Sequence, residues 1–323
     1  MKRSTFVDAV AEKAGLHSSR VGSSRVALGR VEWPTLLLAL VIYAGWLATT
    51  YFHGRIPWPL LAVAGGWLVA WQGSLQHEAI HGHPTPWRRI NALIAAWPLS
   101  LWLPFALYRR SHLDHHAAEH LTLPGDDPET RYLAPATGGL GRAAALIEAA
   151  NATLAGRVLL GPPLEIGRFL AGEARAVIGD RGRLAIWAVH VALAALVVAW
   201  VVGVCGMSLG EYLLAFVYPG TALSLLRSFA EHRADADPAR RIAVVERAPL
   251  LGLLFLNNNL HVVHHHRPGE PWYRLPRLYR ARRAELLAQG GPVYAGYREV
   301  AARYLLRPHD QLIHPAFEPG GQP

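Results

Sequence analysis

The chain alternates between long apolar stretches without charge and polar stretches that hold nearly all of its ionisable side chains. A helix that crosses the core of a bilayer needs roughly 20 apolar residues, with a range of about 17–25. Four apolar stretches reach this length, alone or with weakly polar flanks, and predict transmembrane helices over about 33–51, 58–76, 184–207 and 211–230. A fifth, shorter stretch, 91–107, is interrupted by Pro98 and Pro104 and predicts a re-entrant or interfacial hairpin.

The composition supports a membrane protein. Hydrophobic residues make up 52% of the 323 residues and charged residues 17%, against a usual charged share of about 25%. This balance argues against a disordered chain and against an ordinary soluble fold. The single cysteine, Cys205, excludes an internal disulfide framework and a cysteine-ligated iron–sulfur cluster. No apolar segment of about 7–15 residues lies close to Met1, so we expect no cleaved signal peptide.

The distribution of basic residues sets the expected orientation. The links 53–57 and 208–211 join the first span to the second and the third to the fourth, so they face the same side. They hold one of the 32 Lys and Arg residues, Arg55, and the positive-inside rule therefore places the other polar regions in the cytoplasm. We expect a multi-pass membrane protein with both termini cytoplasmic, in the inner membrane if the source is bacterial. This topology accounts for the net charge of +9 without a nucleic-acid partner.

These patterns predict an all-α integral membrane protein in three parts. A cytosolic N-terminal tail covers 1–33, a membrane domain with a cytosolic helical cap covers 34–306, and a C-terminal tail covers 307–323. The run of Pro, Gly and Asp over 124–128 predicts a tight turn. Helical periodicity in the polar regions predicts cap helices over 143–155, 166–178, 278–289 and 294–306.

Nine of the 17 histidines fall in four groups at the cytoplasmic ends of the predicted spans. Residues three or four apart share one face of a helix, with residues four apart separated by about 40° around the axis. Their convergence at one level of the membrane also requires residues 91–107 to return to the side that they left. The groups are one HxxxH pair, two HxxHH boxes and one histidine after the fourth span: His77, His81, His112, His115, His116, His232, His261, His264 and His265.

Nine imidazoles at one level are enough for two metal ions with four or five ligands each. Imidazole suits zinc, copper, iron and nickel, so the spacing alone does not name the metal. Asp126, Asp127 and Glu129 follow the first HxxHH box, either as hydrogen-bond partners of ligand imidazoles or as part of an ordinary turn. The sequence leaves open the roles of four other histidines: His83, His120, His190 and His266.

The motifs HEAIH (77–81), HLDHH (112–116) and HVVHH (261–265) resemble, as an ordered set, the three histidine boxes of the integral-membrane fatty acid desaturase superfamily. The resemblance extends over about 34–280. It implies a mushroom-shaped fold with four spans and a cytosolic cap. It also implies a non-haem di-iron centre, held by the nine histidines above, that uses dioxygen and two electrons from an external donor such as a ferredoxin.

One ligand position departs from that family pattern. Some members carry an asparagine one helical turn before the histidine that follows the last span, and it holds a water on iron. Here that histidine matches His232 and the earlier position is Ser228, which leaves Asn258 and Asn259 as alternatives.

The resemblance implies a membrane enzyme that desaturates fatty acyl chains. Relatives hydroxylate alkanes or sterols, or hydroxylate or ketolate carotenoids, and segments 83–87 and 271–276 are similar to parts of carotenoid ketolases. A metal transporter is a third hypothesis, but its ligands would lie inside the spans. Basic residues on the cytoplasmic side would attract an acidic electron donor, lipid headgroups or an anionic substrate: Arg88, Arg89, Arg109, Arg110, Arg274, Arg277, Arg280, Arg282 and Arg283.

Overall fold

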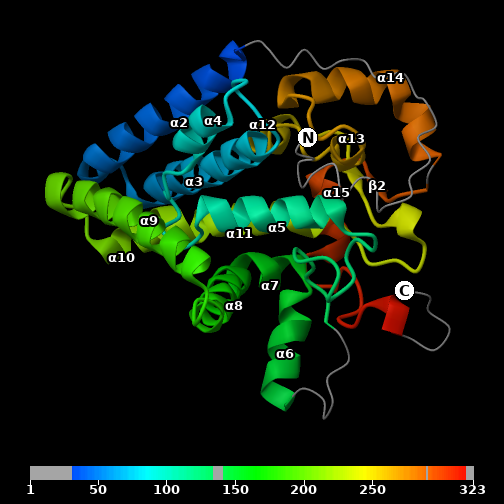
Figure 1. Ribbon diagram of the computed structural model, residues 1–323. Coiled ribbons are helices and arrows are strands. Elements are labelled where there is room, and N and C mark those ends of the chain that lie inside the picture. Colours follow the sequence, from blue (N-terminus) through cyan, green and yellow to red (C-terminus); the bar gives the residue numbers. More distant parts are fainter. Residues whose placement is uncertain (1–30, 134–140, 289, 318–323) are drawn as a thin grey trace, which may run out of the picture.

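The computed structural model describes residues 31–133, 141–288 and 290–317. Nearly all of the predicted N-terminal tail, 1–33, lies outside the described residues, as does the end of the C-terminal tail, 318–323. The described residues are mostly helical (Figure 1), and they include one short parallel sheet in which β1 (Val244–Val245) pairs with β2 (Val293–Tyr294). The predicted helical character is therefore confirmed for most of this part of the chain, and the short sheet departs from the all-α prediction.

The four long apolar helices form close to where the sequence predicts them. They are α2 (Trp33–Tyr51), α3 (Trp58–Ile80), α9 (Arg181–Val198) with its π-helical continuation to Val204, and α10 (Leu209–Tyr212) continued through Leu213–Val217 into α11 (Tyr218–Glu231). Three helices in the described residues are long and apolar enough to cross a membrane: Trp33–Tyr51, Arg181–Val204 and Leu209–Glu231. The helix α3 is as long but is less apolar, because its last turns carry buried polar side chains.

Small residues let α3 approach α11 and the preceding segment Leu213–Val217 closely. A Cβ atom added at Gly65 would lie 2.5 Å from the carbonyl oxygen of Ala215, and one added at Gly220 would lie 2.6 Å from Cβ of Val69. Only glycine fits such contacts, which are typical of helix pairs packed inside a membrane. The outer faces of α2, α3 and α9 expose large apolar residues such as Leu40, Val63 and Val189, as expected of surfaces that face lipid.

A non-helical segment, 96–104, separates α4 (Arg88–Ala95) from α5 (Phe105–Ala117). Three of its carbonyl groups are bound by polar side chains of the long helices. Gln72 donates to the carbonyl of Trp97 at 2.8 Å and Tyr212 donates to that of Leu99 at 2.7 Å. His190 binds the carbonyl of Leu101 at 2.9 Å, which gives this buried histidine a structural partner. Irregular backbone is tolerated at membrane depth only when it is satisfied in this way.

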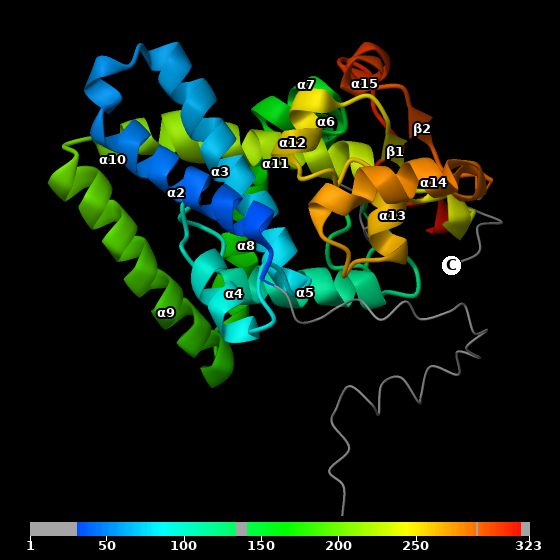
Figure 2. The ribbon, with the colours of Figure 1, turned by 90° about the horizontal axis from the view of Figure 1, so that it is seen from above.

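A set of further helices, called the cap here, lies toward the end of the long helices opposite to α10 (Figures 1 and 2). The helix predicted over 143–155 is broken at Thr153, whose hydroxyl caps a new helix by accepting from the amide of Gly156 at 3.0 Å. The helices predicted over 166–178, 278–289 and 294–306 form within a few residues of these bounds. The cap helices are α6 (Arg142–Asn151), α7 (Leu154–Leu159), α8 (Gly161–Ala176), α12 (Pro249–Leu254), α13 (His261–His266), α14 (Leu275–Leu287) and α15 (Tyr297–Tyr304).

We expect His190→Leu to destabilise the protein by about 1–3 kcal/mol, because the carbonyl of Leu101 would remain buried without a donor. The neighbouring residue Val189 is 62% exposed on the outer face of α9, so Val189→Leu is the matched control. Thermal unfolding of the two variants in detergent measures the difference. Equal unfolding temperatures for His190→Leu and the control would contradict this role.

Candidate metal centre

The four predicted histidine groups meet at the junction between the long helices and the cap. The first pair lies at the end of α3, where His77 is in the last turn and His81 directly follows it. The first HxxHH box lies in α5 and the second in α13, while His232 directly follows α11. Each group therefore occupies a helix or a helix end, which fixes the direction of its side chains.

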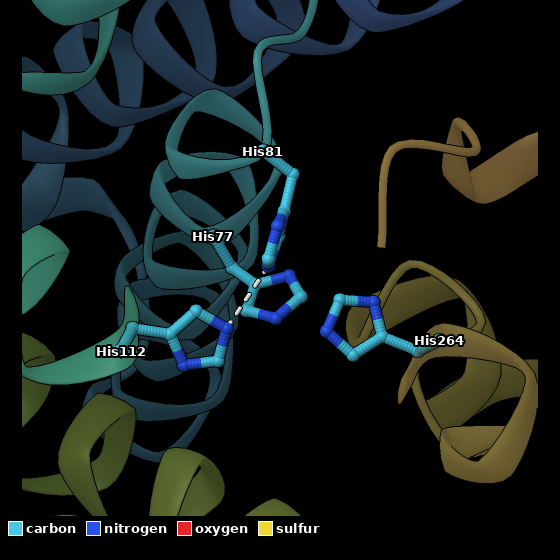
Figure 3. Close-up of side chains that lie close together, drawn as sticks. All are labelled: His77, His81, His112 and His264. Atoms are coloured by element: carbon cyan, nitrogen blue, oxygen red, sulfur yellow. Dashed lines mark hydrogen bonds between the residues drawn. The ribbon is translucent and has the colours of Figure 1, made fainter. Parts of the chain in front are cut away.

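Four imidazoles, those of His77, His81, His112 and His264, point toward one space (Figure 3). One ring nitrogen of each lies within 4.8 Å of those of the others. His81 and His112 approach to 3.0 Å between their Nε2 atoms. His116 belongs with this group, because its Nε2 atom lies 3.1 Å from that of His112 and 3.0 Å from that of His264.

The other four predicted histidines, His115, His232, His261 and His265, form a second group of the same compactness. Nε2 of His261 lies 2.8 Å from Nε2 of His232 and 3.1 Å from Nε2 of His265. The two groups adjoin, since the rings of His116 and His265 are 4.5 Å apart between centroids. All nine predicted histidines thus lie in two neighbouring sets, one of five and one of four.

This donor arrangement fits transition-metal ions. Nitrogens that bind one ion at about 2.1 Å and at right angles lie about 3 Å apart, and the Nε2 contacts in both groups are 2.8–3.1 Å. The Nε2 atoms of His77 and His115 are buried and have no hydrogen-bond partner among the described residues. A buried nitrogen without a partner is costly unless something binds it.

Carboxylates hold the opposite ring nitrogens of several of these histidines. Nδ1 of His115 lies 2.8 Å from Asp127 and Nδ1 of His112 lies 3.1 Å from Glu129. Such contacts place the proton on Nδ1 and leave Nε2 as the metal donor. Of the three acidic residues that the sequence singles out, Asp126 instead accepts from the backbone amide of His120 and belongs to the turn.

A third carboxylate, Glu231, was not predicted from the sequence. It is buried at the end of α11, where Oε2 lies 3.7 Å from Nδ1 of His261 and 3.3 Å from Nε of Arg227. Its Oε1 atom accepts a hydrogen bond from Asn258 at 3.0 Å. The available signal was a lone carboxylate at the end of an otherwise apolar stretch, directly before His232.

Burial and neighbouring imidazoles keep three of the nine histidines neutral, and an adjacent imidazole keeps Glu129 charged. Burial, together with the neighbouring imidazoles, lowers the pKa of His264 and of His265 well below the usual value, and lowers that of His116 to about 3. Burial would raise the pKa of Glu129, but the adjacent His112 outweighs it and lowers that pKa to about 2. Neutral imidazole is the form that binds metal, so these three histidines are in the metal-binding form at neutral pH.

The histidines whose roles the sequence left open lie outside both groups. His83 pairs with Glu32, 2.6 Å from its carboxylate, at the start of α2. The backbone amide of Trp272 in segment 271–276 donates to Glu78, and its indole donates to Thr35, so this segment packs near segment 83–87. His266 is exposed at the end of α13, and His190 binds the backbone of segment 96–104.

A cavity of about 310 Å³ reaches the histidines from between α3, α5, α8 and α11. Its size falls at the low end of the range for small-molecule pockets, about 300–1,000 Å³. Its wall mixes apolar residues such as Trp102 and Phe169 with polar ones such as Ser224. At the metal end it is lined by four of the nine histidines, which are His112, His115, His232 and His261.

Comparison with known proteins gives the family. A family model described as fatty acid desaturase matches residues 54–297, which is well over half of the 323 residues. No curated protein matches the chain. The chain therefore belongs to the fatty acid desaturase family, as the histidine boxes led us to expect.

We expect Asp127→Asn to weaken metal binding by about 10–100-fold, the usual effect of removing a partner that orients a ligand. The carboxylate accepts from the backbone amides of Glu129 and Thr122 as well as facing His115, and an amide offers one oxygen for these three contacts. Titration of the apoprotein with Fe²⁺ measures the affinity. Asp126→Asn, at the neighbouring position in the turn, is the control, and equal affinities for the two variants would contradict the assignment.

Proposed function

We propose that this chain is a membrane di-iron oxidase that desaturates fatty acyl chains with dioxygen and two electrons from an external donor. The observation that carries the proposal is the pair of adjoining histidine groups at the end of a cavity. Membership of the desaturase family supports iron as the metal. In this proposal the five histidines of the first group hold one iron, and the four of the second group hold the other.

We further propose that α2, α3, α9 and the α10–α11 helix cross the membrane and that residues 91–107 form the re-entrant hairpin. The link 53–57 lies beside the link 208–211 at one end of the bundle, because Nδ1 of His53 lies 3.2 Å from Glu211 and Nε2 lies 3.2 Å from the carbonyl of Cys205. The histidines lie at the opposite ends of these helices. This supports a cytosolic position for the metal centre, the helical cap and both tails. We propose the same domain boundaries as the sequence predicts, which are 1–33, 34–306 and 307–323.

In this proposal the chain's own residues orient the ligand imidazoles and the substrate carbon, and they exclude water from the site. When bound, the iron pair supplies the activation of dioxygen and the removal of hydrogen from an unactivated C–H bond. Asp127 and Glu129 hold the Nδ1 protons of His115 and His112, and so fix these rings toward the metals. The cavity walls from α3 and α11 orient the substrate carbon and exclude water. The position of that carbon decides whether a double bond or an alcohol results.

The electrons must come from a partner, and we propose that it docks on basic residues of the cap. Arg277, Arg280 and Arg283 of α14 are all exposed. Such a surface attracts an acidic ferredoxin-like donor. Anionic lipid headgroups are the competing ligand for the same arginines.

A second candidate function is hydroxylation or ketolation of carotenoids or alkanes by the same centre. The observation in its favour is the polar side of the cavity, where Gln72, Ser224 and Arg157 form part of the wall. Such side chains could pair with the hydroxyl or keto oxygen of the product, whereas a double bond in a hydrocarbon chain offers them no partner. Product analysis separates the two functions.

The first test is elemental analysis of the detergent-purified protein beside His115→Ala. We expect about two irons per chain in the wild type, as nine imidazole donors allow, and a clear loss in the variant. Incubation with dioxygen, a ferredoxin donor and membrane lipids should give a product lighter by two hydrogens for desaturation, or heavier by one oxygen for hydroxylation. Zinc alone in the wild type, or full activity in His115→Ala, would overturn the proposal.

A second test concerns the cavity. Gly73 lines it, and a Cβ atom added there would have only the hydroxyl of Ser224 nearby, at 3.8 Å. We expect Gly73→Leu to fill part of the cavity and to lower kcat/KM by about 10-fold or more, since misplaced substrate reacts slowly, while iron content is unchanged. Gly167→Leu in α8 is the control because Gly167 has no atom within 4 Å of its added Cβ and does not line the cavity. Unchanged kcat/KM in Gly73→Leu would show that the substrate binds elsewhere.

A further inference from the structure

The C-terminal segment 307–317 returns to the cap and is held there by backbone hydrogen bonds. The amide of His309 donates to the carbonyl of Ala152 at 2.9 Å, and the amide of Leu133 donates to that of Leu312 at 2.9 Å. His309 is 5% exposed and His314 is fully buried. A segment anchored in this way carries polar side chains into the interior, where they must find partners.

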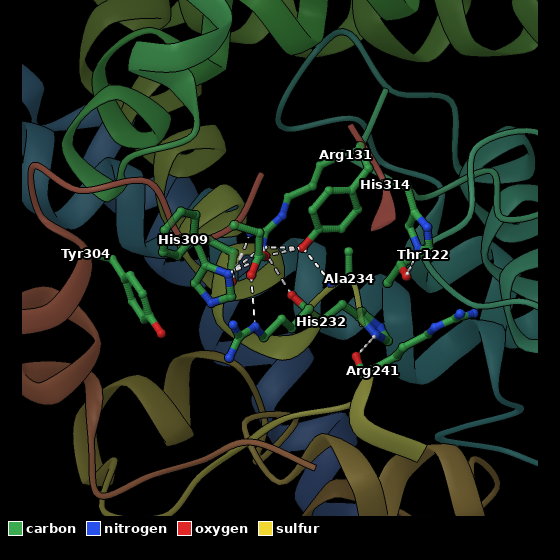
Figure 4. Close-up of polar contacts among 12 residues, drawn as sticks. Thr122, Arg131, His232, Ala234, Arg241, Tyr304, His309 and His314 are labelled. Carbon is green, nitrogen blue, oxygen red and sulfur yellow. Dashed lines mark hydrogen bonds and ion pairs between the residues drawn. The ribbon is translucent and has the colours of Figure 1, made fainter. Parts of the chain in front are cut away.

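The partners of Asp310 surround the stretch that carries His232. One carboxylate oxygen accepts from Arg131 at 2.8 Å and from the hydroxyl of Tyr132, and the other accepts from Nε of Arg233 at 2.9 Å. Tyr132 in turn accepts from the amide of Ala234 at 2.8 Å. Asp310 therefore brings together the side chains of Arg131, Tyr132 and Arg233. Figure 4 shows Arg131, His232 and Ala234 in this network of polar contacts.

Arg131 links this carboxylate to the end of α11. Its guanidinium donates to the carbonyls of Phe229 at 3.0 Å and of His232 at 3.3 Å. The last carbonyls of a helix lack partners within the helix, and a cation there satisfies them and stabilises the helix dipole. Asp310 holds the guanidinium in that position, so it acts on the direction of His232 through Arg131.

A second contact leads from the same segment to His115. Nε2 of His314 lies 3.0 Å from the hydroxyl of Thr122, whose backbone amide donates to Asp127 at 2.8 Å. Asp127 is the carboxylate that faces Nδ1 of His115. Both chains of contacts thus end on histidines of the second group, which holds four of the nine imidazoles.

We propose that segment 307–317 is a clasp for the second metal site and that Asp310 and His314 are positioning residues for His232 and His115. The inference rests on the proposed function for the identity of the metal. The first histidine group draws its ligands from α3, α5 and α13, and the contacts of Asp310 and His314 end on the other group. Weakening the clasp therefore releases the metal of the second group first.

The test compares Asp310→Asn and Asp310→Glu with Asp237→Asn, all in the full-length protein loaded with Fe²⁺. Asp237 is an exposed residue of the same type that caps a short surface turn. We expect Asp310→Asn to weaken binding of one of the two irons on the order of 10-fold, at the lower end of the effect of an orienting partner. Asp310→Glu, which keeps the charge, should restore part of that affinity.

Two further readouts separate positioning from a loss of fold. Electron paramagnetic resonance of the oxidised Asp310→Asn protein should show an isolated ferric ion in place of a coupled pair. The iron that remains in the first group reports that the fold is intact. His314→Gln should give the same signature, because it weakens the other arm of the clasp.

The outcomes distinguish this inference from the proposal on which it rests. Two irons per chain with unchanged affinity and signature in Asp310→Asn and His314→Gln would overturn the clasp alone. Loss of both irons together in Asp310→Asn would overturn it as well, because the effect would not be selective. A wild type that binds no iron would overturn the proposed function itself.

Discussion

Buried polar groups in this chain must find their partners inside the chain, and most of the architecture follows from that constraint. An apolar bundle offers no water to irregular backbone, so the carbonyls of segment 96–104 are bound by Gln72, Tyr212 and His190. These side chains make the bundle less apolar, above all in α3. These polar positions in the long helices therefore have partners in segment 96–104 and hold it in place.

The same constraint organises the histidines. An imidazole has two nitrogens, and in a buried ring each of them needs a partner. Asp127 and Glu129 take the Nδ1 side of two rings, and the backbone carbonyl of Arg241 lies 3.4 Å from Nδ1 of His232. Because these Nδ1 atoms already have partners, the Nε2 atoms of the same rings face one another and form a compact set of metal donors. The spacing of the histidines within the boxes does not by itself fix the direction of the Nε2 atoms, which also depends on these carboxylates.

Local patterns in the sequence predicted the parts of this arrangement that depend on neighbouring residues. Apolar runs gave the long helices within a few residues, and spacings of three and four gave the faces of the histidine boxes. The partners of His190 and Asp310 could not be predicted, since their contacts join residues about 90 and 180 positions apart. Periodicity carries no information about such pairs, because either partner alone reads as an ordinary buried or surface residue. Glu231 lies between these two cases. A lone carboxylate at the end of an apolar stretch was a visible signal in the sequence, but its contact with His261 depends on how α11 packs against α13.

The site is built in successive layers that come from different parts of the chain. The candidate ligands and the carboxylates that orient them lie inside the region matched by the family, residues 54–297. Some of the residues that hold the helix ends lie outside this region. Glu32 binds His83 beside the end of α3, and Asp310 binds Arg131 beside the end of α11. The matched region thus supplies the donors, while the flanking segments fix the helix ends that carry them. Because a shift of a helix end moves an imidazole with it, the described flanking residues, 31–53 and 298–317, would set the precision of the proposed metal centre without lying in either histidine group.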